Sequence, residues 1–174
     1  MHDNISYHNI KDRCFMQKIS LLFFDQQNQL AINDDIWFAI TQIEQQLFED
    51  AWNKQSLLDS LNQFGTKMLI AFDGNCVIGY CIFNSVFEIA EILRVAVSQK
   101  HQKMGVGEQL LIKSCQIAKD NQAEKMLLEV RMDNLPAINL YKKLKFYQID
   151  IRKNYYQFSH QKLDALIFEK NLLA

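Results

Sequence analysis

The stretch QKMGVG, Gln102–Gly107, lies between an apolar run that is typical of a strand and an amphipathic run that is typical of a helix. A glycine-bearing turn that leads into a helix leaves several backbone N–H groups without intrahelical partners, all directed toward one place. Those donors and the positive end of the helix dipole favour a bound phosphate. The two glycines permit a closer backbone approach than a Cβ would allow. The stretch therefore predicts a turn that holds a phosphorylated ligand.

The glycine spacing differs from that of two common phosphate loops. A dinucleotide-binding turn requires G-x-G-x-x-G within a βαβ unit, and the loop that binds nucleoside triphosphates requires Lys followed by Ser or Thr after its second glycine. Here Glu108 follows Gly107, and the pattern is Q-x-x-G-x-G after the apolar run Leu93–Val97. A glycine pair before a helix can also form only a turn, so neighbouring segments must decide between the two interpretations.

Length and composition favour one cytoplasmic domain. We expect a single domain over residues 1–174, with a poorly determined extension at 1–30 and a motif-bearing core at 88–165. The net charge of −1 gives no general attraction to nucleic acid or to an anionic membrane. No signal peptide or C-x-x-C pair is visible, so the cysteines are expected to be buried thiols in a reducing compartment and not a metal site. These are Cys14, Cys76, Cys81 and Cys115.

The hydrophobic pattern predicts a mixed α+β fold, with helices on both faces of a mainly antiparallel sheet. Asp73-Gly74-Asn75 between two apolar runs indicates a hairpin, Asn33 a helix start, and Gly65 a helix end. Helices are expected from Asn33 to about Leu47 and over 54–62, 105–119 and 136–144, and strands over 18–24, 67–72, 76–83, 88–97, 125–132, 146–158 and 162–170.

Glu129 stands inside an otherwise apolar strand, where glutamate is disfavoured. Strand alternation places it on the face opposite Leu128 and Val130. One interpretation is a solvated or arginine-paired edge position. The other is a general base that takes a proton from an amine.

Two further residues of the same stretch have a structural and a chemical interpretation. Asn134, just before the only proline, suits a helix N-cap. Tyr141, near the middle of the following helix, suits a core position, but its phenol could also donate a proton to a departing thiolate.

Together these motifs carry a resemblance to a known family. The glycine turn, the run LEVRMDNLPAINLYKKLKF over 128–146 and the run RKNYY over 152–156 occur in the order seen in the GCN5-related N-acetyltransferase (GNAT) superfamily. They resemble in particular its RimI-type ribosomal-protein alanine N-acetyltransferases. The resemblance implies the GNAT fold, with a sheet splayed at the cofactor site, and acetyl-CoA as the co-substrate with no metal.

The resemblance also implies residue roles. Glu129 matches the family's proton acceptor and Tyr141 its proton donor. Contacts to acetyl-CoA are implied for the strand residues Val95, Ala96 and Val97, for the turn residues Lys103, Met104, Gly105, Val106, Gly107 and Glu108, and for Asn134.

The implied acceptor is the N-terminal α-amine of a protein, an alanine-initiated protein of the small ribosomal subunit. Arg152, Tyr155 and Tyr156 would lie near its groove, although the pattern alone equally fits an exposed loop with packed aromatic rings. Two alternatives remain: the same fold acting on a small amine, an antibiotic or a lysine side chain, and a non-catalytic acyl-CoA-binding module. No nucleic acid or membrane partner is expected, and the oligomeric state, monomer or weak dimer, stays open.

Three positions depart from the family pattern. Lys145 stands where the family usually has glycine after the short helix, and Glu108 where the residue is often basic. The proline that usually precedes the tryptophan is absent from the run Phe48–Trp52. Lys145 bears on the turn after the short helix, Glu108 on the charge beside the bound phosphates, and the missing proline on the shape of the acceptor groove.

Overall fold

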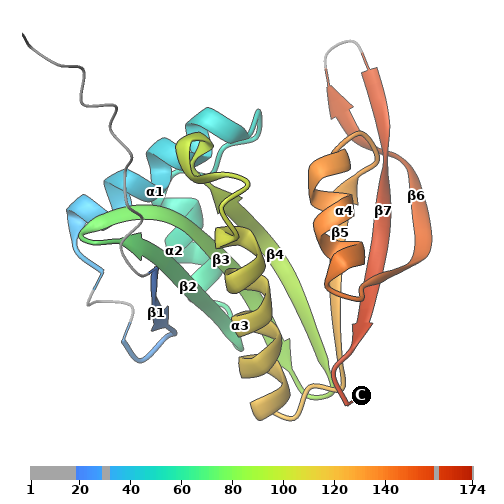
Figure 1. The fold of residues 1–174 in the computed structure, drawn as a ribbon, viewed down its shortest axis with the longest axis horizontal. Coiled ribbons are helices and arrows are strands. Elements are labelled where there is room, and N and C mark those ends of the chain that lie inside the picture. The colour runs from blue at the N-terminus through green and yellow to red at the C-terminus, as the bar shows by residue number, and fades with distance from the viewer. Residues whose placement is uncertain (1–18, 29–31, 159–160, 174) are drawn as a thin grey trace, which may run out of the picture.

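The computed structural model describes residues 19–28, 32–158 and 161–173 and contains one seven-stranded sheet with helices on both faces (Figure 1). The strand order is β1-β2-β3-β4-β5-β7-β6. The strands are β1 (Ser20–Phe24), β2 (Thr66–Asp73), β3 (Cys76–Val86), β4 (Ile89–Val97), β5 (Lys125–Arg131), β6 (Tyr147–Phe158) and β7 (Gln161–Asn171).

The sheet parts in its middle, between β4 and β5. These two strands form the parallel pair, and their pairing joins Ile89–Ile92 only to Lys125–Leu128. The other neighbouring strands are antiparallel. Beyond Ile92 the C-terminal half of β4 pairs with β3 alone, so its other edge faces the gap that opens toward β5. The predicted mixed, splayed sheet is therefore confirmed.

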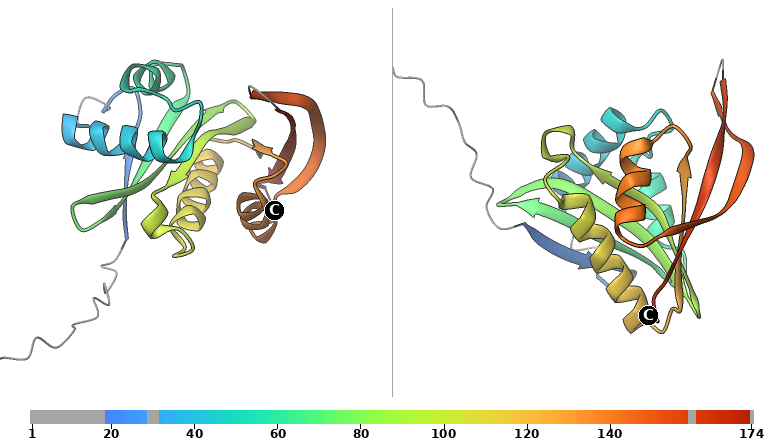
Figure 2. Two further views of the ribbon diagram at one scale, coloured as in Figure 1. Left: turned by 90° about the horizontal axis from the view of Figure 1, so that it is seen from above. Right: turned by 45° about the vertical axis from the view of Figure 1, so that its right-hand side comes forward.

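Helices cover the two faces of the sheet in pairs (Figure 2). The first pair, α1 (Asp34–Leu47) and α2 (Lys54–Leu61), packs on one face, and the second, α3 (Val106–Asp120) and α4 (Leu135–Lys143), packs on the other. A short 3₁₀ turn, η2 (Gln99–His101), joins β4 to the glycine turn. None of the helices described has the length and apolarity needed to cross a membrane.

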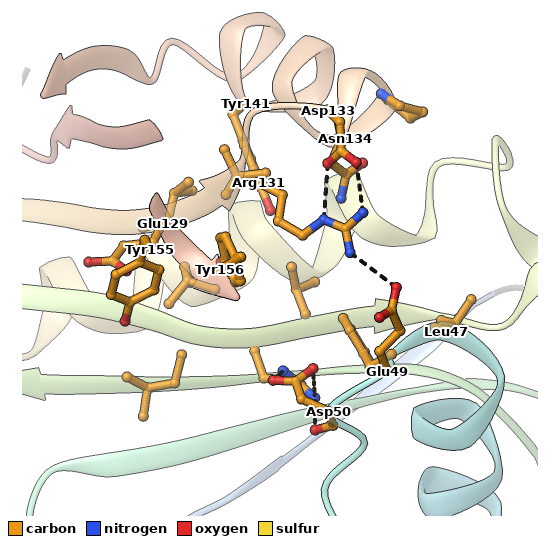
Figure 3. A pocket seen from close by; sticks show the side chains of 18 residues that line it. Leu47, Glu49, Asp50, Glu129, Arg131, Asp133, Asn134, Tyr141, Tyr155 and Tyr156 are labelled. Carbon is orange, nitrogen blue, oxygen red and sulfur yellow. Dashed lines mark hydrogen bonds and ion pairs between the residues drawn. The ribbon is translucent and has the colours of Figure 1, made fainter. Parts of the chain in front are cut away.

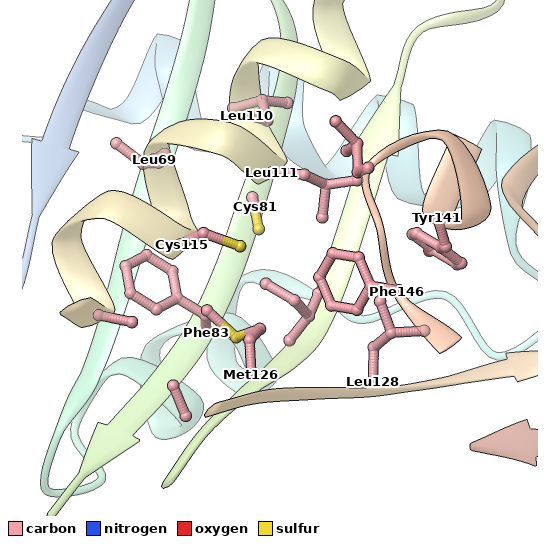
Figure 4. Close-up of a cluster of buried hydrophobic side chains, with 14 of the residues drawn as sticks. Leu69, Cys81, Phe83, Leu110, Leu111, Cys115, Met126, Leu128, Tyr141 and Phe146 are labelled. Atoms are coloured by element: carbon pink, nitrogen blue, oxygen red, sulfur yellow. The ribbon is translucent and has the colours of Figure 1, made fainter. Parts of the chain in front are cut away.

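Two apolar clusters hold the helices to the sheet. The cluster under α3 and α4 includes Leu110, Leu111, Phe83 and Met126, and Figure 4 shows it as a continuous layer that reaches Tyr141. The cluster under α1 and α2 contains the buried side chains of Trp37, Ile40, Leu57, Leu61 and Tyr80. Burial of each such side chain contributes on the order of 1.5–3 kcal/mol, so these clusters dominate the stability of the fold.

The local signals that predicted the elements are visible at the helix and strand ends. Asn33 accepts a hydrogen bond from the backbone N–H of Ile36 and caps α1, and Asn53 does the same for α2. Gly74 has a φ of 57°, as the hairpin between β2 and β3 requires. The face of α3 that packs on the sheet is buried and consists of Val106, Leu110, Leu111, Ser114, Cys115 and Ala118.

Two expectations are wrong in detail. Gly65 does not end α2, whose C-cap is Asn62; it lies in the turn before β2 with a φ of 79°, where a Cβ would come within 2.9 Å of the Ser85 carbonyl. Cys76 is exposed and not buried, because it begins β3 directly after the hairpin turn. Cys81 and Cys115 are buried as expected, while Cys14 and most of the 1–30 extension lie outside the described residues.

Candidate active site

A cleft of about 610 Å³ opens where β4 and β5 part (Figure 3). Four parts of the chain line it: the end of α1 with the segment that follows, the middle of β4, the end of β5 with α4, and β6. The lining residues are Leu47–Asp50, Ile92–Val95, Leu128–Arg131, Asp133, Asn134, Pro136, Tyr141, Tyr155 and Tyr156. Six of the predicted site residues are thus brought together, namely Val95, Glu129, Asn134, Tyr141, Tyr155 and Tyr156.

The glycine turn lies beyond the C-terminal end of β4 and is not part of the lining of this cleft. Gly105 is the N-cap residue of α3 and has a φ of 83°. Among the described residues, no side chain accepts a hydrogen bond from the backbone at this end of α3. A Cβ at Gly105 would meet no atom within 4 Å, whereas one at Gly107 would lie 3.4 Å from Leu140. Gly105 therefore supplies the left-handed conformation, while a Cβ at Gly107 would make an ordinary van der Waals contact with Leu140 of α4. The N-terminal backbone donors of α3 remain available to an anion.

The carboxylate of Glu108 does not stand alone beside this turn. The ammonium of Lys143, on α4, donates a hydrogen bond to Glu108 Oε2 at 2.6 Å. The charge that departs from the family pattern is therefore matched by a cation 35 positions later in the chain.

The β4 residues predicted to contact the cofactor lie on the edge left unpaired by β5. Val95 pairs with Cys81 of β3, and Ala96 and Val97 continue this pairing. The Val97 carbonyl accepts a hydrogen bond of 3.2 Å from the side chain of Gln102, which ties the strand to the glycine turn. The outward backbone groups of this edge can hydrogen-bond an extended ligand in the manner of an added strand.

Glu129 lies on β5 one residue past the last pair with β4, and only 18% of its side chain is exposed. Its carboxylate forms an ion pair with the guanidinium of Arg152 on β6. A second carboxylate, Glu91 of β4, interacts electrostatically with this pair. Burial is the main cause that raises the pKa of Glu91, the charge of Glu129 raises this pKa further, and the charge of Arg152 lowers it. Glu129 is therefore paired with an arginine, as the first interpretation predicted, but β5 is an interior strand of the sheet and not an edge strand.

Tyr141 extends from α4 toward the interior of the cleft and Tyr156 (Figure 3). Its ring packs against Phe146 and Phe168, with centroids at 6.0 and 6.2 Å, so it belongs to the core as well. Burial is the main cause that raises the pKa of Tyr141 far above its usual value, and the phenol therefore stays protonated at neutral pH. Asn134 caps α4 by accepting a hydrogen bond from the Ala137 N–H at 3.3 Å.

A break in the register of β6 and β7 places the two tyrosines. The register shifts between Arg152 and Tyr156, and Asn154 has a φ of 56° while its N–H donates to Asp164 at 2.8 Å. Such a bulge redirects the side chains that follow it. Tyr155 and Tyr156 consequently line the cleft with their rings edge to face at 5.2 Å, and Arg152, which is not in the lining, lies over the Tyr155 ring at 5.4 Å.

Sequence reasoning missed two charged clusters at the cleft, one around Arg94 and one around Arg131. Arg94 of β4 binds the fully buried Glu44 of α1 through two hydrogen bonds, of 3.0 and 2.8 Å. Arg131 of β5 binds Asp133 at 2.7 Å and lies 3.8 Å from Glu49. The available signals were a glutamate directly after Ile43 on the apolar face of α1 and an arginine within an apolar strand, but nothing in the sequence joins them.

A mixed sheet splayed at β4 and β5, with a glycine turn at the start of α3 beside the gap, defines the class of acyl-CoA-dependent N-acyltransferases. The model of the acetyltransferase (GNAT) family matches residues 37–146. The chain therefore belongs to the acetyltransferase (GNAT) family, and its enzyme class is acetyltransferase.

One curated relative and two solved structures are similar to this chain, the structures in fold. The [ribosomal protein bS18]-alanine N-acetyltransferase of Haemophilus influenzae is 32% identical over 115 residues, which are 66% of this chain and 77% of the relative. The crystal structure of the Escherichia coli ribosomal-protein-S18-alanine N-acetyltransferase has a TM-score of 0.75 at 22% identity, over 88% of this chain and 94% of that one. Arabidopsis thaliana NAA60 in complex with acetyl-CoA has a TM-score of 0.74 at 18% identity, over 89% and 100% of the chains.

Proposed function

We propose that this protein transfers the acetyl group of acetyl-CoA to the N-terminal α-amine of a protein, an alanine-initiated protein of the small ribosomal subunit. The observation that carries the proposal is that Glu129 and Tyr141, from different elements, line one cleft at the point where β4 and β5 part. The identity of the acceptor rests on similarity to enzymes described as acting on ribosomal protein bS18.

The residues beside the cleft fit acetyl-CoA. Its pyrophosphate requires backbone donors and a close approach, and the start of α3 offers both at Gly105, where no protein atom lies within 4 Å of a Cβ position. Its pantetheine amides require an extended partner, which the free edge of β4 at Val95–Val97 provides. Acetyl-CoA supplies the acetyl group as a thioester.

The side chains of the cleft suit direct transfer without a covalent enzyme intermediate. Glu129 accepts a proton from the acceptor ammonium, so that a neutral amine is presented to the reacting carbonyl. A backbone N–H of the β4 edge donates to the carbonyl oxygen, where negative charge develops. Tyr141, held protonated by burial, donates its proton to the leaving sulfur.

Arg152 has a particular place in this proposal. In the absence of the acceptor its guanidinium is the cation bound to Glu129. An acceptor ammonium that reaches Glu129 replaces this cation, and the exposed Arg152 side chain is then free to contact the peptide. Tyr155 and Tyr156 line the same cleft as Glu129, so a chain end that reaches Glu129 passes these rings.

A peptide-panel assay tests the function. Purified protein is given acetyl-CoA and peptides that begin with Ala, Ser, Met or Gly, and release of free CoA thiol is followed with a thiol reagent. We expect the highest kcat/KM with the Ala-initiated peptide and no release with its N-acetylated form. Turnover confined to polyamines, aminoglycosides or an internal lysine would replace this acceptor with a small amine or a side chain. Binding of acetyl-CoA with no turnover on any acceptor would indicate a non-catalytic module.

A further inference from the structure

The segment between α1 and α2, residues 48–53, forms a wall of the cleft although it has no regular secondary structure. Phe48, Glu49 and Asp50 of this segment face the cleft. It also contains no proline that would stiffen its backbone. A wall built from a loop needs another means of being held in place if it is to orient a substrate.

Arg94 holds this segment through several contacts at once. Its guanidinium donates to the backbone carbonyl of Asp50 at 3.0 Å and forms an ion pair with the Asp50 carboxylate at 3.3 Å. It lies over the ring of Phe48 at 3.8 Å and over the ring of Trp52 at 4.9 Å. The planar guanidinium thus joins the two ends and the middle of the segment to β4.

Glu44 completes the arrangement from beneath. Its carboxylate is fully buried, accepts two hydrogen bonds from Arg94, and accepts a third from the backbone N–H of Trp52 at 2.7 Å. A buried carboxylate and guanidinium lose much of their hydration, so a pair of this kind adds little net stability compared with apolar side chains of similar size. Its geometry, with donors and acceptors fixed in direction, is what apolar side chains would not reproduce.

The position of Arg94 in the strand connects this cluster to the proposed chemistry. Arg94 lies on the part of β4 that is not paired with β5, directly before Val95, and Arg94 itself lines the cleft. We propose that Arg94 is a positioning residue for the acceptor: through Glu44, Asp50, Phe48 and Trp52 it fixes the 48–53 wall relative to the β4 edge, and thereby sets acceptor affinity without contributing to acetyl-CoA binding. The inference rests on the proposed function, because it assigns the acceptor to this cleft.

Two variants and one control test the role of Arg94. Arg94→Lys retains a cation beside Glu44. It loses the several N–H donors of the guanidinium and the planar group that stacks on the rings of Phe48 and Trp52. The double variant Glu44→Leu with Arg94→Leu removes the buried charges together and keeps the interior apolar. Lys54→Ala is the control, because it removes an ion pair of 2.6 Å that joins α2 to α1 on the exposed side, away from the cleft.

For both Arg94 variants we expect the KM for the peptide to rise by about 10-fold or more, as a displaced binding wall produces. The Kd of acetyl-CoA, measured by calorimetry, should stay within about twofold of the original, because the contacts of Arg94 go to α1 and the 48–53 wall and not to the glycine turn. Lys54→Ala should change neither quantity. An unchanged peptide KM in folded Arg94→Lys, or an equal loss of acetyl-CoA affinity, would overturn the proposal.

Amide hydrogen exchange separates this inference from the function on which it rests. The Trp52 N–H is bonded to Glu44, so its exchange should accelerate in Arg94→Lys while amides in β2 and β3 remain protected. If the original protein acetylates no peptide, the proposed function fails. Unaltered exchange at Trp52 in Arg94→Lys, which keeps the Glu44 acceptor, would show that Arg94 does not hold the wall, whatever the acceptor substrate.

Discussion

The guanidinium of Arg152 on β6 reaches past β7 to form an ion pair with the carboxylate of Glu129 on β5. The proposed proton acceptor is therefore held by a cation that is itself about half exposed, with 51% of its side chain accessible. An exposed partner can leave at modest cost, because water replaces its interactions. The pair keeps the Glu129 carboxylate oriented, and in the proposed function an acceptor ammonium takes the place of the guanidinium.

Replacement of Glu129 by Gln should lower kcat by about 10²-fold or more, as the loss of a general base does. Gln has nearly the shape of Glu but accepts no proton at neutral pH. Acetyl-CoA affinity should be nearly unchanged, because Glu129 lies away from the glycine turn. Steady-state kinetics measures kcat, and calorimetry measures the affinity for acetyl-CoA. A kcat close to the original would remove Glu129 from the mechanism.

Replacement of Tyr141 by Phe should lower kcat by about 10-fold, less than at Glu129, because water can also protonate a thiolate. The aromatic contacts with Phe146 and Phe168 are kept, so the free energy of unfolding should change little. Since the pKa of Tyr141 is raised by burial, the phenol supplies no basic limb to the pH profile near neutrality. A kcat that falls together with the melting temperature would instead indicate a purely structural role.

Replacement of Lys143 by Ala should weaken acetyl-CoA binding, because it leaves the Glu108 carboxylate uncompensated beside the start of α3. The pair is partly exposed, so a rise in Kd of about 3- to 10-fold is expected at low salt, shrinking as salt is added. The double variant with Glu108→Gln should recover most of the affinity. A Kd that fails to recover in the double variant would mean that Lys143 contacts the ligand itself.

The elements could be predicted from the sequence because their signals are local. Asn33 caps α1, Gly74 forms the hairpin, and Glu129 lies on the predicted face of β5, each within a few residues of the pattern that indicated it. The cap of α2 at Asn53 follows the same rule.

The charged pairs could not be predicted because they join distant parts of the chain. Arg94 and Glu44 are 50 positions apart, and Lys143 and Glu108 are 35 apart. Side-chain periodicity indicates which face is buried, but it carries no information on which buried charge meets which. The exposure of Cys76 was missed for a related reason: composition favours buried cysteines, while the turn before this residue decides its surroundings.

The raised pKa of Glu91 predicts a pH-dependent effect on stability. Because burial and Glu129 favour its neutral form, the folded-state pKa lies above the usual value of 4.5, and stability is lost as the pH rises through the folded value. Glu91→Gln stays neutral and should therefore be more stable than the original at pH 7, by about 0.5 kcal/mol or less because the site is half exposed. Urea unfolding at several pH values checks this. The advantage should vanish below pH 4.5, and an advantage independent of pH would contradict the assignment.

Replacement of Lys145 by Gly should stabilise the protein. Lys145 follows α4 with a φ of 67°, and its neighbours complete a Schellman end: the Phe146 N–H donates to the Tyr141 carbonyl and the Lys145 N–H to that of Lys142, both at 3.0 Å. A left-handed conformation costs a residue with a Cβ about 1–2 kcal/mol, partly offset by the greater freedom of glycine in the unfolded chain. A net gain of about 0.5–1 kcal/mol is therefore expected, seen as a higher urea midpoint at an unchanged m value.

The neighbouring lysine provides the matched control for this change. Lys142 is exposed and lies within α4, so Lys142→Gly should destabilise the protein by about 1 kcal/mol. Opposite signs for the same substitution three positions apart would show that backbone conformation, and not the loss of a lysine charge, decides the effect. Because the Schellman end holds the carbonyl of Tyr141, Lys145→Gly should leave kcat unchanged if the geometry is kept. A lower urea midpoint for Lys145→Gly would mean that the lysine side chain contributes more than its strained backbone costs.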